Sequence, residues 1–130
     1  MYRPALIAGT IFGATSVMLG AFGAHGLREI ATPDVIESFR TGATYQMYSA
    51  FFLLAAGMLY TAFPVRAVRV ATWTAVAGVL LFSGSLYAMT GARINGDAGL
   101  VKSIGPVTPI GGIFFVIAWI ALLTAVLRKK

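Results

Sequence analysis

The stretch "ALIAGTIFGATSVMLGAF", residues 5–22, contains no charged residue. A helix of about 18 to 20 apolar residues crosses the roughly 30 Å hydrocarbon core of a bilayer. The composition agrees, because 58% of the 130 residues are hydrophobic and only 11% are charged, whereas about 25% are charged in a soluble domain. The sequence therefore predicts an integral membrane protein whose first span is residues 5–22.

Three more apolar segments follow, at about residues 43–63, 70–91 and 110–127. Together with the first they predict an all-α fold, an antiparallel four-helix bundle in the membrane, with residues 1–130 as a single transmembrane domain. The first segment could instead be a cleaved signal peptide. Its length and the three spans that follow it favour an uncleaved helix.

Basic residues flank the predicted spans on both sides of the membrane. Four spans place on one side Arg3, Arg66, Arg69, Arg128, Lys129 and Lys130. The other side holds all the acidic residues, Glu29, Asp34, Glu37 and Asp97, together with Arg28, Arg40, Arg93 and Lys102. Lysine and arginine in short loops favour the cytoplasmic side, so we expect both termini to be cytoplasmic.

The net charge of +6 indicates an acidic partner. The basic residues flank apolar segments and form no stripe with interleaved aromatic residues, so membrane lipids are expected as the counter-charge and nucleic acid is not.

Two connecting segments carry local signals. "TPDVIESFRTG", residues 32–42, predicts a short extramembrane helix, because Thr32 can cap it and Pro33 suits the first helical position. This helix would either lie on the membrane surface or form the extramembrane start of the second span. "ARINGDAGLVKSIGPVTP", residues 92–109, has glycine and proline punctuation and little periodicity, which predicts a loop.

Small residues predict how the helices pack. Steps of four, three, four and three residues place one stripe on the first span, formed by Gly9, Gly13, Ser16, Gly20 and Gly23. The third span carries a heptad series, Ala77, Gly84 and Gly91. Because close backbone approach drives helix association in lipid, we expect the first and third spans to be in close contact.

Uncharged polar residues gather at similar depth towards the non-cytoplasmic side. They form a candidate ligand site of His25, Tyr45, Gln46, Ser49, Tyr87 and Thr108. The plainer interpretation is that His25 interacts with carbonyls at a helix end and that the others are interhelical hydrogen-bonding groups.

Other chemistry finds little support. The chain has no cysteine and a single histidine, which is too few ligands for a metal site. No serine has a recognisable base, so no catalytic residue is predicted and the protein is not expected to be an enzyme. No cofactor is implied. The spans lack central ionisable residues, which disfavours a proton-driven transporter.

Four blocks in order carry a family resemblance: "LGAFGAHGL" at 19–27, "TGATYQMY" at 41–48, "LFSGSLY" at 81–87 and "GPVTPIGG" at 105–112. They resemble the YgdD/YwdK-like family of small four-span membrane proteins, a domain of unknown function. The resemblance implies a bacterial inner-membrane protein with an uncleaved first span, and it implies no activity. Relatives commonly carry histidine after the "YQ" block, where this chain has Ser49, so a paired-histidine site is not expected.

Two functions follow as hypotheses. The first is a non-enzymatic membrane protein that acts by association, with itself or with a larger membrane complex, because of its small-residue stripe and short loops. The alternative is a binder or carrier of a lipid- or quinone-like amphipathic molecule at the non-cytoplasmic end of the bundle.

Overall fold

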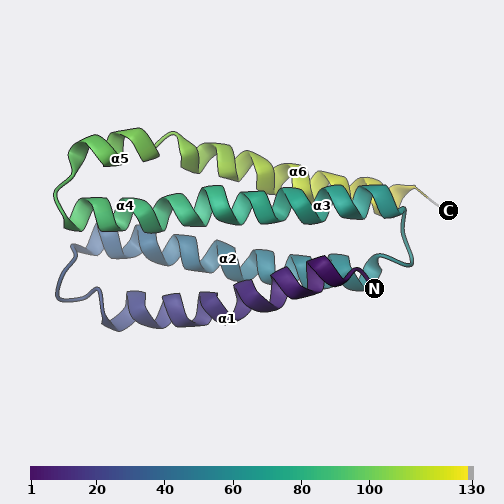
Figure 1. The fold of residues 1–130 in the computed structure, drawn as a ribbon, viewed down its shortest axis with the longest axis horizontal. Coiled ribbons are helices and arrows are strands. Elements are labelled where there is room, and N and C mark those ends of the chain that lie inside the picture. The colour runs from purple at the N-terminus through teal and green to yellow at the C-terminus, as the bar shows by residue number, and fades with distance from the viewer. Residues whose placement is uncertain (129–130) are drawn as a thin grey trace.

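The computed structural model describes residues 1–128, and Lys129 and Lys130, which count toward the predicted orientation, lie outside them. Within this range four long helical stretches run side by side (Figure 1). The first two are α1, Arg3–His25, and α2, Pro33–Leu59. The third is continuous through α3, Val65–Gly78, the π-helix η1, Val79–Ser83, and α4, Gly84–Ile94. The short α5, Ala98–Ile104, leads into α6, Val107–Leu127. The predicted all-α membrane bundle is confirmed.

Three stretches are long and apolar enough to cross a membrane: Arg3–His25, Val65–Ile94 and Ala98–Leu127. The helix α2 has the length, at 27 residues, but is less apolar because it carries charged residues in its first turns and polar residues at its middle. Two of these, Gln46 and Ser49, are buried inside the bundle. The inner position of α2 explains its polarity, since a helix enclosed by other helices can satisfy polar groups away from lipid. Four spans stay a prediction.

The helices are arranged in the order α1, α2, α3–α4 and α6 (Figure 1). The helix α1 packs along α2, α6 packs along α3 and η1, and α2 also packs against α3, η1 and α4. A core cluster joins these layers through Ala5, Leu53, Ala75 and Ala118. The expected close contact between the first and third spans is therefore wrong: α1 makes its extensive interface with α2.

The small-residue stripe of α1 lies against α2 over most of its length. A Cβ atom on Gly9 would lie 3.0 Å from the Ala50 carbonyl oxygen, and one on Gly23 would lie 2.8 Å from the Phe39 ring. Between them, the Ser16 hydroxyl donates a 2.8 Å hydrogen bond to the Ala43 carbonyl oxygen, and a Gly13 Cβ would meet the Ala50 side chain at 3.7 Å. Gly20 differs, because no atom lies within 4 Å of its Cβ position.

Close approach in the other half of the bundle uses glycines that the heptad series missed. A Cβ atom on Gly111 would lie 2.3 Å from the Phe82 backbone nitrogen, so α6 touches the backbone of η1 directly. A Cβ on Gly78 would lie 2.4 Å from the Phe115 ring. The heptad prediction is wrong: Gly91 has open space around it and Gly84 has only a carbonyl of its own helical stretch at 4.0 Å. Ala77 is only half-buried.

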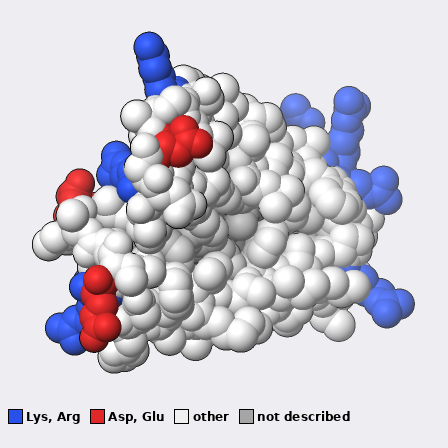
Figure 2. Space-filling view, turned by 60° about the vertical axis from the view of Figure 1, so that its left-hand side comes forward, with Lys and Arg blue, Asp and Glu red and all other residues white. Residues whose placement is uncertain are grey.

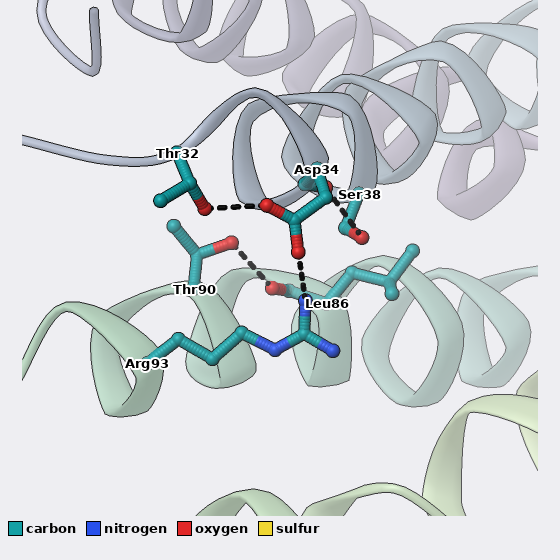
Figure 3. A network of polar contacts seen from close by, with 6 residues as sticks. All are labelled: Thr32, Asp34, Ser38, Leu86, Thr90 and Arg93. Atoms are coloured by element: carbon teal, nitrogen blue, oxygen red, sulfur yellow. Dashed lines mark hydrogen bonds and ion pairs between the residues drawn. The ribbon is translucent and has the colours of Figure 1, made fainter. Parts of the chain in front are cut away.

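The segment at 32–42 is the start of α2 and not a separate helix. Of the two predicted placements, the extramembrane beginning of the second helix is the observed one. Thr32 is the N-cap residue and Pro33 the first helical residue, but the Thr32 hydroxyl donates to the Asp34 carboxylate and not to a backbone amide. The Asp34 carboxylate also forms an ion pair with Arg93 of α4, with 3.8 Å between Asp34 Oδ2 and Arg93 Nη1 (Figure 3). This contact joins the start of α2 to the end of α4.

The predicted loop at 92–109 contains the helix α5, so that part of the prediction is wrong. The Asp97 carboxylate accepts a 3.0 Å hydrogen bond from the Leu100 amide and caps this helix. Gly96, with φ of 72°, provides the turn before it. A capping carboxylate needs only one turn of helix to act on, and a helix of 7 residues is too short to produce a periodic signal.

Charged side chains gather at the two ends of the bundle and leave its sides apolar. In Figure 2 the acidic side chains lie at one end and only basic ones are seen at the other. The acidic end, where α1 runs into α2 and α4 into α5, is named for the acidic residues, all of which lie there, although it also carries Arg28, Arg40, Arg93 and Lys102. The basic end carries Arg3, Arg66, Arg69 and Arg128. The separation matches the one predicted from four spans.

Candidate functional site

The six residues of the predicted ligand site are distributed over four places. Gln46 and Tyr87 meet inside the bundle, and Thr108 bonds to a neighbouring helix. Tyr45 and Ser49 line a pocket on the other side of α2. His25, the last residue of α1, is exposed, and its side chain makes no hydrogen bond or ion pair within the described residues. The predicted cluster is therefore not one site.

Gln46 connects three helices. Its side-chain nitrogen donates to the Phe12 carbonyl oxygen at 3.0 Å and to the Thr15 hydroxyl at 2.7 Å, both on α1. Its side-chain oxygen accepts a 2.7 Å hydrogen bond from the Tyr87 hydroxyl of α4. With Gln46 only 4% exposed, both ends of the amide are satisfied by protein. This pair is part of the internal packing.

Two more interhelical hydrogen bonds lie in the same half of the bundle. Ser83, in η1, donates to the Gly42 carbonyl oxygen at 2.7 Å. The hydroxyls of Ser85 and Thr108 bond to each other and join α4 to α6. Thr108 thus has the interhelical role that the plainer interpretation of the sequence gave it.

A pocket of about 410 Å³ lies between α2, η1 and α6. We name it the aromatic pocket, because its lining includes Tyr45, Tyr48, Phe52, Phe82, Phe115 and Trp119. Four of these rings contact one another around Tyr45, whose centroid lies 5.0 Å from that of Phe82. The other two form a separate pair, with the Phe52 centroid 4.7 Å from that of Trp119. The volume lies in the range of about 300–1,000 Å³ that is typical of small-molecule sites.

Hydroxyl groups without protein partners give the aromatic pocket a polar component. Ser49 is 7% exposed, lines the pocket, and makes no side-chain hydrogen bond within residues 1–128. Tyr45 and Tyr48 also line the pocket, and their hydroxyls make no hydrogen bond in the described chain, although these two side chains are exposed, at 44% and 60%. Each hydroxyl can donate one hydrogen bond and accept others. The pocket therefore offers a mostly apolar, aromatic surface with a few free donors.

The backbone around the pocket is irregular at one point. Phe82 belongs to η1, a π-helical segment of 5 residues inside the long third helix. Such single-turn segments often occur at functional sites. Here η1 places the Phe82 ring over the pocket while its backbone lies against Gly111.

The sequence interpretation missed most of the pocket lining. The pairs Tyr48 and Phe52 on α2 and Phe115 and Trp119 on α6 each have a spacing of four residues, a pattern shared with ordinary lipid-facing residues. The available signal was the pair Gly111 and Gly112, where the first allows contact with η1 and the second leaves room in the pocket. Within the described residues no group of three metal-ligating side chains gathers at this or another site.

Comparison with known proteins extends over nearly the whole chain. Residues 19–112 match the family described as "Protein of unknown function (DUF423)". The "UPF0382 membrane protein YwdK" of Bacillus subtilis is 36% identical over 124 residues, which cover 95% of this chain and 95% of that protein. A UPF0382 membrane protein of Staphylococcus epidermidis is 36% identical over 125 residues, covering 95% and 94%. No solved structure matches the chain.

Proposed function

This chain belongs to the DUF423 family of membrane proteins, as its sequence motifs predicted, and we propose that it binds a lipid- or quinone-like amphipathic molecule in the aromatic pocket. In this function the protein binds its ligand without acting as an enzyme. The ligand places a ring or unsaturated chain among the aromatic side chains and a carbonyl or hydroxyl near Ser49.

One observation carries the proposal: Ser49 is nearly buried, lines the pocket and has a hydroxyl with no protein partner. Every fully buried side-chain nitrogen or oxygen of the described residues has a hydrogen-bond partner, so the unpartnered Ser49 hydroxyl keeps some accessible surface and is open to a ligand in the pocket that it lines. A ligand carbonyl that accepts from Ser49 would satisfy it. The surrounding rings would pack on the apolar part of the ligand, preferring offset or edge-to-face contacts.

The pocket supports this function better than the stripe supports association. The stripe on α1 suggested a surface for a partner, but most of it packs against α2 of the same chain. Apart from Trp119, the large exposed hydrophobic side chains of α6 are all aliphatic. Such a surface fits contact with lipid chains. Association with a second copy or with a membrane complex is left without a specific surface among the described residues.

We also propose a placement in the membrane. All four long helices cross the bacterial inner membrane, with both termini and the basic end in the cytoplasm. The support is that the charged residues described at the basic end are all basic and lie close to the apolar segments, as is typical of cytoplasmic loops. The inner position of α2 supports its crossing, because two polar residues near its middle, Gln46 and Ser49, are buried inside the bundle.

Native mass spectrometry of protein released gently from its own membrane tests the binding function. We expect a discrete small-molecule mass on the parent protein. Ser49→Ala removes the free hydroxyl, and Gly112→Leu places a side chain at the pocket wall, so both should reduce ligand retention. The matched control is Thr10→Ala, since the Thr10 hydroxyl bonds only to carbonyls of its own helix, at 3.0 and 2.9 Å.

A ligand mass retained equally by all variants would contradict binding in this pocket. So would the absence of any small-molecule mass from protein that remains folded. If instead a homo-oligomer or partner mass appears and is unaffected by the substitutions, association becomes the better account.

A further inference from the structure

A second, larger cavity lies at the acidic end, where the chain passes from α1 into α2. It has a volume of about 1000 Å³, and we name it the end cavity. Its charged lining residues are Arg28, Glu37 and Arg40, and the hydroxyl-bearing ones are Thr41, Thr44 and Tyr45. Tyr45 also lines the aromatic pocket, so the two cavities share this residue.

The end cavity has unpaired positive charge. Within residues 1–128 neither Arg28 nor Arg40 takes part in an ion pair, whereas Arg93 at the same end of the bundle pairs with Asp34. Glu37 lines the cavity and is also without an ion pair in the described chain. Two guanidinium groups against one carboxylate leave a net charge of +1. Arginine binds phosphate through paired hydrogen bonds, so this cavity suits a phosphate group.

A groove leads from the end cavity along the outside of the α1–α2 pair. Its volume is about 350 Å³, and it shares Ala24, Arg40 and Thr44 with the end cavity. Gly20 and Met47 line it further along. The open space over Gly20, where no atom lies within 4 Å of the Cβ position, is the one interruption in the packing of the α1 stripe. The groove therefore has room for a hydrocarbon chain.

We propose that the end cavity and this groove together bind one anionic phospholipid. Its headgroup phosphate lies between Arg28 and Arg40, and one acyl chain follows the groove past Gly20. The charges support a lipid of net charge −1, since the cavity carries +1. The position supports a lipid over a soluble phosphate, because the cavity lies at a helix end, where arginine side chains reach headgroup depth, and the groove descends from it.

This inference goes beyond the proposed ligand of the aromatic pocket, and the two can fail independently. Substitutions at Arg28, Arg40 and Gly20 leave the lining of the aromatic pocket intact, and Ser49 and Gly112 are absent from the end cavity and the groove. Tyr45 lines both cavities and Tyr48 lines both the aromatic pocket and the groove, and both residues are left unchanged in every test.

The test is lipid retention in native mass spectrometry, with delipidated protein and two added lipids of identical chains, phosphatidylglycerol and phosphatidylcholine. The parent should retain phosphatidylglycerol preferentially. Arg40→Gln and Arg28→Gln should each reduce its retention about tenfold, the effect expected on losing a hydrogen bond to a charged group. The matched control is Arg93→Gln, which removes an arginine from the same end outside the end cavity and should leave retention unchanged.

Two further variants separate the parts of the site. Glu37→Gln removes the carboxylate that repels the phosphate, so it should increase phosphatidylglycerol retention, a gain that misfolding cannot produce. Gly20→Leu fills the groove and should reduce retention of the lipid without changing its headgroup preference.

Equal retention of the two lipids by the parent would overturn the proposal. So would equal effects of Arg40→Gln and Arg93→Gln, or weaker retention in Glu37→Gln. Competition by glycerol 3-phosphate as effective as that by the whole lipid would show that the cavity binds a soluble phosphate, which overturns the lipid assignment.

Discussion

The Tyr87 hydroxyl lies 2.7 Å from the side-chain oxygen of Gln46 and donates a hydrogen bond to it, which joins α4 to α2 inside the bundle. The same amide donates to two groups on α1, so one side chain connects three helices. The sequence suggested Gln46 as a ligand-binding residue, but its amide makes its hydrogen bonds to other groups of the protein.

Replacing Gln46 should destabilise the bundle. Gln46→Leu removes three interhelical hydrogen bonds and leaves the half-buried Tyr87 hydroxyl without its acceptor, so we expect unfolding in detergent to become easier by roughly 1–3 kcal/mol. Tyr87→Phe removes only one of these bonds and should have a smaller effect. If Gln46→Leu unfolds like the parent protein, the network contributes nothing to stability.

Gly111 should tolerate no side chain. A Cβ atom there would lie 2.3 Å from the backbone nitrogen of Phe82 and 2.7 Å from its Cα, so Gly111→Ala must push α6 away from η1. We expect the free energy of unfolding, measured by thermal unfolding, to fall by about 1–3 kcal/mol. Gly112→Ala is the matched control, because its Cβ would meet only the Phe82 ring, at 3.9 Å. Equal stability of the two variants would contradict this contact.

The Asp34 carboxyl should titrate at low pH. The hydrogen bond from the Thr32 hydroxyl holds its pKa below the ordinary value of 3.8, with a smaller contribution from Arg93. A lowered pKa in the folded state adds stability that is present above pH 3.8 and is lost as the pH falls through the lowered value. An NMR titration of the Asp34 carboxyl should give a midpoint below 3.8.

Two variants check the cause of that shift. Thr32→Ala should bring the Asp34 midpoint closer to 3.8 than Arg93→Gln does, because the Thr32 hydrogen bond is the larger cause. A midpoint unaffected by Thr32→Ala would show that this hydrogen bond does not form in solution.

The proposed orientation can be tested with single cysteines, because the chain has no cysteine of its own. Ser103→Cys in α5 and Ala62→Cys in the α2–α3 connection introduce exposed thiols at opposite ends of the bundle. A membrane-impermeant maleimide should label the first in intact cells and the second only after lysis. The reverse pattern would place the termini outside.

The sequence predicted the helices well and their neighbours poorly. Uncharged runs located the long helices because a bilayer requires them, and each predicted span overlaps an observed helix. The stripe from Gly9 to Gly23 correctly indicated a closely packed face. Spacing alone does not identify the helix on the other side, and α2, the next helix in the chain, proved to be the partner.

The aromatic pocket was the least predictable feature. Ser49 and Trp119 come from helices far apart in the sequence, and each taken alone resembles an ordinary residue of a membrane helix. The π-helical turn that positions Phe82 has no signal in "VLLFS", residues 79–83. Tyr45 and Ser49 were selected from their polarity and depth, but the same criteria also selected Gln46 and Thr108, whose polar groups are satisfied internally.

The tryptophan indole signals give the most direct test of a ligand in the aromatic pocket. The chain has two tryptophans: Trp119 lines the pocket, and Trp73 bonds to the Tyr2 hydroxyl at 3.2 Å, away from it. Indole N–H resonances, assigned with Trp73→Phe, are compared between gently extracted protein, delipidated protein, and delipidated protein with its own lipid extract restored. Binding in the pocket predicts that the Trp119 signal shifts on delipidation and returns with the extract while the Trp73 signal stays. A Trp119 signal that is unchanged, or that moves equally with Trp73, would contradict it.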